Sequence, residues 1–237
     1  MAATEPERPR PTARALARAA MTDDIKAIAR RHLAEHGSDG LSLRAVAREL
    51  GVVSSAVYRY FASRDELLTA LIVDAYNAVG AAAEEAAADH RGGVAARWKR
   101  VAHAVRRWAL VNPHDYALVY GSPVPGYRAP EDTVSPALRL TLAPLGVIRD
   151  GVEAGEVDVE PRSSVSRPVH ADFSILRAGA GMDLPDEVMA RALAAWTGLL
   201  GHISYELFGH LHNGITDFEA FFEHQLERST VQLVSGA

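Results

Sequence analysis

Apolar residues recur every three or four positions along most of the chain, which is the period of an amphipathic α-helix. The clearest stretch is residues 42–71, where three such stripes follow one another. The first stripe includes Leu43, Val46 and Leu50, and Gly51 then ends it with the backbone freedom that a tight turn needs. Alternation of period two, the sign of a strand, does not persist, so the pattern predicts an all-α protein.

The second stripe predicts another short helix that begins near Ser54. Its apolar side chains are expected to pack back on the first helix: Val53, Val57 and Phe61. Ser63, with Glu66 three residues later, has the spacing of a capping box, so a third and longer helix is expected to start there. Two short helices joined by a glycine-containing turn predict a helix-turn-helix, whose second helix can enter the major groove of DNA.

The rest of the chain is also helical in pattern. Upstream, Ile25, Ile28 and Leu33 form a stripe with Thr22 as the expected N-cap, and residues 12–20 are expected to add another helical segment. Further helices are predicted over residues 64–90, 94–111, 113–120, 134–155, 187–211 and 216–233. We therefore expect two domains. Residues 1–66 would form an N-terminal arm and a three-helix DNA-binding head, and residues 67–237 a helical body for ligand binding and dimerisation.

The strings LSLRAVAREL and GVVSSAVYRYFASRDELL, which are contiguous, closely resemble the DNA-binding signature of the TetR family of transcriptional regulators. The matching positions are Leu41, Ser42, Arg44, Val46, Ala47, Gly51, Val52, Val57, Tyr58, Tyr60, Phe61, Ser63 and Leu67. Two positions depart from the family pattern. Val53 stands where a capping serine is usual, so the cap is expected to pass to Ser54, and Arg64 replaces the usual lysine but keeps the positive charge.

The resemblance implies a regulator that binds double-stranded operator DNA as a homodimer, most often a repressor that a small organic ligand releases from a palindromic site. Base edges would be read by Ser54, Ser55, Ala56 and Arg59. Backbone phosphates would be contacted by Ser42, Tyr58, Tyr60 and Arg64, and Arg44 would reach either. The outward position of Ser54, Ser55 and Arg59 also follows from helical spacing, because the apolar stripe turns them away from the first helix.

The body resembles one actinobacterial-type class of TetR C-terminal domain, in residues 112–127 and 195–211. The second piece carries the order Trp196, Gly201, His202 by which the class is identified. A ligand pocket is expected in such bodies, and aromatic side chains suit a small organic ligand. The candidate wall residues are Trp98, Trp108, Tyr116, Tyr120, Tyr127, Phe173, Trp196 and His202. Each of them taken singly is better explained as part of the hydrophobic core, so the prediction concerns the group and not any one member.

Charge and composition add to this interpretation. The 237 residues include no cysteine and are 48% hydrophobic, which is enough for a sizeable core without disulfides. Residues 1–66 carry 11 Lys and Arg against 9 Asp and Glu, whereas residues 67–237 carry 14 against 21. A mildly basic head on an acidic body suits a protein that touches phosphates at one end. Arg8, Arg10, Arg14 and Arg18 have no acid between them and form either a solvated tail or an arm toward DNA.

No uninterrupted apolar run of about 18 residues and no apolar signal core occur, so we expect a cytoplasmic protein with no membrane partner. The sequence leaves two other classes open. His202 and Glu206 are four residues apart and His210 continues that spacing, so one helix face could bind a metal or support catalysis. No catalytic motif accompanies them, and we predict no catalytic residue, metal or cofactor. A helical adaptor would instead present apolar anchors from the second short helix.

Overall fold

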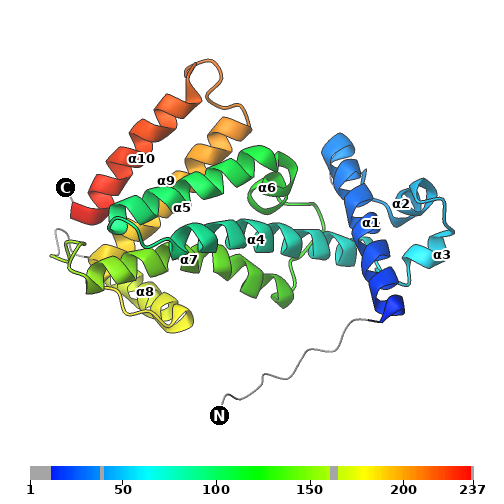
Figure 1. The fold of residues 1–237 in the computed structure, drawn as a ribbon, viewed down its shortest axis with the longest axis horizontal. Helices are drawn as coiled ribbons and strands as arrows, with labels where there is room; N and C mark the ends of the chain where they lie inside the picture. Colours follow the sequence, from blue (N-terminus) through cyan, green and yellow to red (C-terminus); the bar gives the residue numbers. More distant parts are fainter. Residues whose placement is uncertain (1–11, 38–39, 161–164, 236–237) are drawn as a thin grey trace, which may run out of the picture. The chain divides into compact units, whose positions relative to one another are not determined.

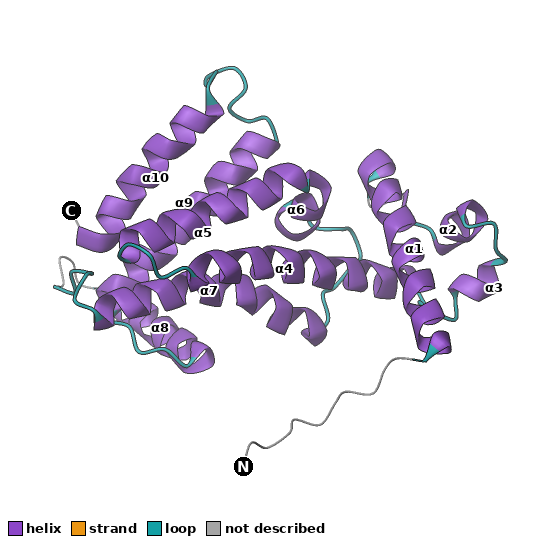
Figure 2. Ribbon diagram, in the orientation of Figure 1, coloured by secondary structure: helices purple, strands orange, loops and turns teal. Residues whose placement is uncertain are grey.

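The computed structural model describes residues 12–37, 40–160 and 165–235, and in these residues the prediction of an all-α protein is confirmed. Figure 1 gives the order of the helices, and Figure 2 shows helices joined by loops with no strand among the described residues. The chain divides into two compact units, Met1–Leu71 and Ile72–Ala237. The boundary falls within helix α4, Arg64–Ala88. We refer to the first unit as the head and to the second as the body.

The head begins with α1, a single helix over Ala13–His36. The prediction of a helix start at Thr22 is wrong. The Thr22 hydroxyl donates to the Arg18 carbonyl at 2.9 Å inside the continuous helix, and Thr12 is the N-cap, accepting from the Ala15 amide at 3.2 Å. A threonine hydroxyl can bond back to the preceding turn, which makes it compatible with a helix interior.

Helices α2, Leu43–Glu49, and α3, Ser54–Val57, form the predicted helix-turn-helix. Gly51 lies in the turn with φ of 70°, a conformation that only glycine adopts without strain. The expected packing of Val53 is wrong. Val53 is the N-cap of α3 in an extended conformation and its side chain is 71% exposed. The α3 helix has no side-chain cap, so Ser54 does not take that role.

Helix α4 begins as predicted, because the Glu66 amide donates to the Ser63 hydroxyl at 3.1 Å. The Glu66 carboxylate accepts from the Ala62 amide at 2.6 Å, one residue before the usual capping-box partner. By length and composition alone, α4 is a helix that could cross a membrane, and 44% of its most apolar window is buried inside the protein. Its inward positions include the fully buried Leu67, Leu71 and Val79, which is the pattern of a core helix.

The body contains α5, Val94–Val111, and α6, Pro113–Tyr120, with the bounds that the sequence predicts. A 3₁₀ turn, η2 over Glu131–Thr133, leads into α7, Val134–Glu153, which has Pro144 in its interior. The remaining helices are α8, Arg167–Ala180, α9, Asp186–Leu207, and α10, Phe218–Ser235. Their shared core is built mainly from Val, Leu, Ile and aromatic side chains of α5, α7, α9 and α10.

Helix α7 also forms hydrogen bonds with the part of α4 that belongs to the body. The Arg139 guanidinium donates to Asn77 at 2.7 Å and to both carboxylate oxygens of Glu84, at 2.8 and 2.6 Å. Between these two partners, a Cβ on Gly80 would lie 3.0 Å from the Cβ of Arg139, so a larger residue would require Arg139 to shift by a few tenths of an ångström. The position of α4 is therefore coupled to that of α7.

Candidate functional site

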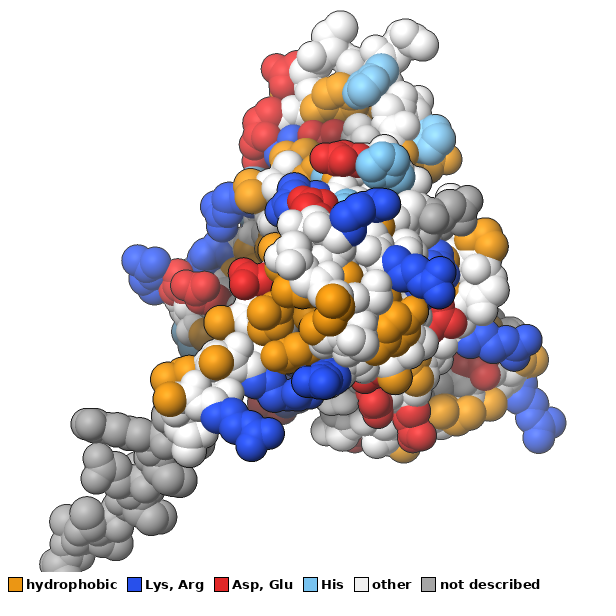
Figure 3. Space-filling model, turned by 90° about the vertical axis from the view of Figure 1, so that its right-hand side faces the viewer, with side chains coloured by type: hydrophobic (Ala, Val, Ile, Leu, Met, Phe, Trp, Pro, Cys, Tyr) orange, Lys and Arg blue, Asp and Glu red, His pale blue; other side chains and the backbone are white. Residues whose placement is uncertain are grey.

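The outward side of α2 and α3 carries the polar residues that the sequence assigns to DNA. None of the nine is buried: Ser42, Arg44, Ser55, Tyr58 and Arg59 are exposed, and Ser54, Ala56, Tyr60 and Arg64 are half-buried. Figure 3 views the molecule from the right-hand side of Figure 1, where α2 and α3 are drawn, and shows Lys and Arg side chains spaced among uncharged ones. The nine residues lie between Ser42, the N-cap of α2, and Arg64, the first residue of α4, all within one compact unit.

The opposite side of the helix-turn-helix is apolar and hidden. Val46, Ala47 and Val57 are at most 1% exposed, and Phe61 is 5% exposed. Burial of these side chains holds the two short helices in the head. Each Å² of apolar surface removed from water stabilises the folded state by about 25 cal/mol. The polar side is therefore presented to solvent by the packing of the other side, and that arrangement suits contact with a phosphate backbone and with base edges.

Polar side chains of α1 contact the end of α2 and the segment after α3. The Glu49 carboxylate at the end of α2 accepts from Arg31 and, at 2.7 Å, contacts the His32 ring. These partners hold the pKa of Glu49 below its usual value, with the Arg31 bond the larger cause. Arg18, earlier on α1, places its guanidinium 4.8 Å from the centroid of the Tyr60 ring. No sequence pattern predicts this contact, because its two residues lie far apart in the chain.

The aromatic residues predicted to line a ligand pocket are spread over the body. Trp98 and Trp196 line a small cavity of about 10 Å³ between α5, α7 and α9, and His202 and Trp108 belong to two other hollows. Trp98, Tyr116, Phe173 and Trp196 are buried in the core, and Trp108, Tyr120, Tyr127 and His202 are half-buried. The indole N–H of Trp98 has no hydrogen-bond partner among the described residues, although it is buried.

Three tyrosines from α4 and α6 meet in the body. The Tyr120 ring lies 5.1 Å from that of Tyr116 and 6.4 Å from that of Tyr76, measured between ring centroids. The Tyr116 hydroxyl donates to the Leu200 carbonyl at 2.9 Å and shares a 2.8 Å bond with Ser204. Burial raises the pKa of Tyr120 and Tyr116 above the usual value, so both hydroxyls are neutral donors at pH 7. The cluster connects α6 to both α4 and α9.

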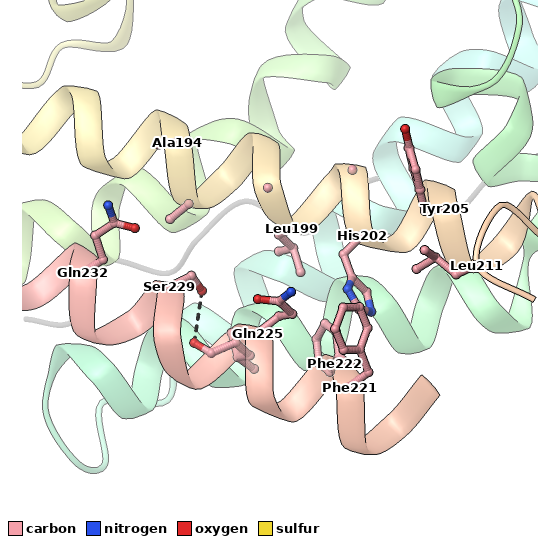
Figure 4. Close-up of a pocket in the computed structure, with 14 residues that line it drawn as sticks. Ala194, Leu199, His202, Tyr205, Leu211, Phe221, Phe222, Gln225, Ser229 and Gln232 are labelled. Carbon is pink, nitrogen blue, oxygen red and sulfur yellow. Dashed lines mark hydrogen bonds between the residues drawn. The ribbon is translucent and has the colours of Figure 1, made fainter. Parts of the chain in front are cut away.

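A mainly apolar groove of about 470 Å³ lies between α9 and α10 and is lined in part by the predicted residue His202; we call it the α9–α10 groove. Figure 4 shows side chains of both helices along it, with Gln225 and Gln232 on one side and Tyr205 at one end. Gly198 and Gly201 line its α9 side, and a Cβ at either position would meet open space. Two glycines facing open space in one helix leave room for another helix to approach.

Behind the groove, a buried cation ties three helices together. Arg106 of α5 donates to Glu206 of α9 through Nε at 2.9 Å and Nη2 at 2.8 Å, and it also bonds Glu219 of α10. The Arg106 and Glu206 side chains are only 8% and 10% exposed. His202 Nε2 lies 3.8 Å from Glu206 and has no hydrogen-bond partner in the described part of the chain, and burial lowers the pKa of His202 below its usual value.

This arrangement argues against the alternative of a metal-binding face on α9. The α9 helix ends at Leu207, because Gly209 has φ of 78°, so His210 does not continue the face of His202 and Glu206. The Glu206 carboxylate is already engaged by Arg106. Among residues 12–37, 40–160 and 165–235, no group of three or more histidine or acidic side chains is placed to hold a metal ion.

Comparison with known families covers both units. Residues 25–71 match the family model described as bacterial regulatory proteins, tetR family, and residues 98–229 match the model described as tetracyclin repressor-like, C-terminal domain. The HTH-type transcriptional regulator Rv1816 of Mycobacterium tuberculosis is 45% identical over 194 residues, which cover 78% of this chain and 80% of the relative. The regulator Mb1846 of Mycobacterium bovis matches with the same figures.

Solved structures give the same fold. The crystal structure of protein SCO4313 superposes with a TM-score of 0.74 at 34% identity, covering 93% of this chain and 98% of the other. The TetR family transcriptional regulator PfmR of Thermus thermophilus has a TM-score of 0.55 at 19% identity, covering 89% of this chain and 97% of the other. At that identity the second likeness concerns the fold alone.

Proposed function

The chain belongs to the TetR family of DNA-binding transcriptional regulators, and from this premise we propose that it is a repressor that binds a palindromic operator as a homodimer and leaves it when a small organic ligand binds. The observation that carries the DNA part is the exposed polar side of α2 and α3 behind a buried apolar one. It is a regulator and not an enzyme. Its site of action would be the cytoplasm, where operator DNA lies.

On DNA, α3 would lie in the major groove. Arg59 would donate two bonds to a guanine, Ser54 and Ser55 would bond base edges, and Ala56 would touch a thymine methyl. Val53 joins this set, because its exposed side chain lies at the N-terminus of α3 and can also contact a thymine methyl. Phosphates would be contacted by Ser42, Tyr58, Tyr60 and Arg64, with Arg44 reaching either.

Arg59→Ala is expected to lose about 1–3 kcal/mol of binding free energy and to relax the preference at one base pair. The reason is that a bidentate arginine–guanine contact distinguishes that base from the other three. The change is measured by fluorescence anisotropy, with an operator obtained by selection of bound sites from random duplex DNA and with single-base variants of that operator. Arg64→Ala is the comparison, since loss of a phosphate contact should weaken all sequences alike and flatten the salt dependence. An equal loss on every sequence would assign Arg59 to phosphate.

For dimerisation we propose that the α9–α10 groove meets the same groove of a second copy. The groove has an apolar floor that includes Leu199, Phe222 and Leu226, and its two glycines leave room for a facing helix. Trp196, Gly201 and His202 would mark this class of body because Gly201 and His202 line the groove, whereas Trp196, also on α9, lies in the core at the cavity shared with α5 and α7. Two heads about 34 Å apart would then read successive major grooves.

For the effector we propose the region of the body between α5, α7 and α9. The cavity lined by Trp98 and Trp196 is far smaller than the roughly 300–1,000 Å³ of a typical ligand site, so these helices would have to separate. Pro144 lies at this cavity and removes one backbone hydrogen bond from α7, which makes α7 the easier helix to deform. Movement of α7 would also shift α4, because Arg139 of α7 is hydrogen-bonded to α4.

The effector proposal is tested by screening metabolites for release of the selected operator, followed by tryptophan fluorescence of each active compound. A releasing compound should change the emission of Trp98 and Trp196, and Trp196→Phe should alter that response. Release without any change in tryptophan emission would place the effector elsewhere.

A further inference from the structure

Helix α3 is a single turn and depends on its surroundings for its shape. It spans Ser54–Val57 and has no side-chain cap at its N-terminus. One isolated helical turn is unfavourable, because several dihedral angles are fixed for one hydrogen bond. Yet this turn and the three residues after it carry six of the nine side chains that the sequence assigns to DNA: Ser54, Ser55, Ala56, Tyr58, Arg59 and Tyr60. Their positions therefore depend on whatever holds the C-terminal end of the turn.

Arg18 of α1 supplies two contacts at that end. Its guanidinium carbon lies 4.8 Å from the centroid of the Tyr60 ring, within the range of a cation–π interaction. Its Nη2 donates to the Arg59 carbonyl at 3.4 Å, at the long end of the hydrogen-bond range. Arg59 lies two residues after the last residue of α3, so Arg18 holds the segment that follows the helix against α1.

We propose that Arg18 is a positioning residue for DNA recognition, which holds Arg59 and Tyr60 in place without itself contacting the duplex. The inference rests on the proposed function, because it needs Arg59 and Tyr60 to meet DNA. It differs from what the sequence suggests, since Arg18 belongs to a row of arginines that predicts a solvated tail or a DNA-contacting arm.

Arg14 provides a matched control. It lies on α1 one turn before Arg18, is likewise exposed, and has no hydrogen bond or ion pair among the described residues. Arg14→Ala and Arg18→Ala therefore remove the same charge from the same helix, and only the second removes contacts to the end of α3. A larger loss of operator affinity for Arg18→Ala than for Arg14→Ala would measure the positioning effect, whereas equal losses would reflect the removed charge alone.

The experiment measures operator affinity of the full chain across a range of salt concentrations for wild type, Arg14→Ala, Arg18→Ala and Arg18→Lys. We expect Arg18→Ala to bind about two- to five-fold more weakly, with the salt dependence of wild type. Arg18→Lys should recover part of the loss, because a lysine ammonium can still lie over the ring. A salt slope reduced by about one would make Arg18 a phosphate contact and overturn the inference.

A second comparison isolates the Tyr60 ring. In a Tyr60→Phe background the ring remains, and Arg18→Ala should still weaken binding; in a Tyr60→Leu background its effect should shrink, because the two residues are coupled. Equal losses in both backgrounds, or no loss from Arg18→Ala in the wild-type chain, would overturn the inference. Circular dichroism of each variant verifies that the helices are intact. Wild-type protein that binds no duplex would instead contradict the proposed function.

Discussion

Gly201→Glu is expected to give a well-folded monomer that no longer holds a palindromic operator. A side chain at Gly201 meets open space within one subunit, and replacing a helix-interior glycine stabilises the helix by up to about 1 kcal/mol. In the proposed dimer the same carboxylate would be buried against the facing helix, twice by symmetry. An unpaired buried charge costs several kcal/mol, so the dimer dissociation constant should rise on the order of 100-fold or more.

Sedimentation velocity gives the oligomeric state of this variant, circular dichroism its helix content and anisotropy its affinity for the operator. Gly179→Glu is the control, because Gly179 is also an exposed helical glycine with open space around it, but it lies in the last turn of α8, outside the groove. The control should behave as wild type in all three measurements. A Gly201→Glu protein that stays dimeric and binds DNA normally would move the interface away from the α9–α10 groove.

Arg106→Leu is expected to lower the free energy of unfolding by about 3–5 kcal/mol. The change leaves the buried Glu206 carboxylate without its bidentate partner and removes the cation that joins α5 to α9 and α10. It also removes a guanidinium 4.5 Å from the centroid of the Phe222 ring. Urea unfolding followed by circular dichroism measures the loss, at one fixed protein concentration because dimerisation contributes to apparent stability.

Two further variants interpret that result. Arg107→Leu is the control, since Arg107 is the exposed neighbour on α5 and forms no ion pair among the described residues; it should change stability by less than about 0.5 kcal/mol. The double variant Arg106→Leu, Glu206→Leu should regain much of the loss, because apolar replacements of a buried ion pair are often tolerated. Equal stability of Arg106→Leu and wild type would show that the network contributes little.

Local rules predicted the helices whose ends are set by their own residues. Gly51 and the pair Ser63 and Glu66 fix the turn and the start of α4 through short-range hydrogen bonds, and Pro113 sets the start of α6. Errors arose where one residue can satisfy its hydrogen bonds in two ways. Thr22 bonds inside α1 and does not cap it. The helix predicted from residue 216 begins two residues later as α10, because Asp217 caps it and accepts from the Ala220 amide at 2.9 Å.

The functional surfaces were less predictable because distant segments build them. The spacing of Ser55 and Arg59 indicates an outward face, but the contact of Arg18 with Tyr60 spans residues that no periodicity connects. The α9–α10 groove likewise forms only when two helices lie side by side. The sequence pattern therefore predicted His202 as a site residue but not the groove that it lines. Aromatic residues were the least reliable predictors of the ligand pocket. The same large apolar side chains are found both in hydrophobic cores and in pocket walls, so their presence does not distinguish the two.

Selection of bound sites from random duplex DNA, with the stoichiometry of the selected complex, tests the central claim most directly. If the polar side of α2 and α3 reads DNA from two paired subunits, the enriched sequences should form an inverted repeat with half-sites about one helical turn apart, bound by two chains. Enrichment of sequences without two-fold symmetry, or no enrichment at any salt concentration, would contradict it.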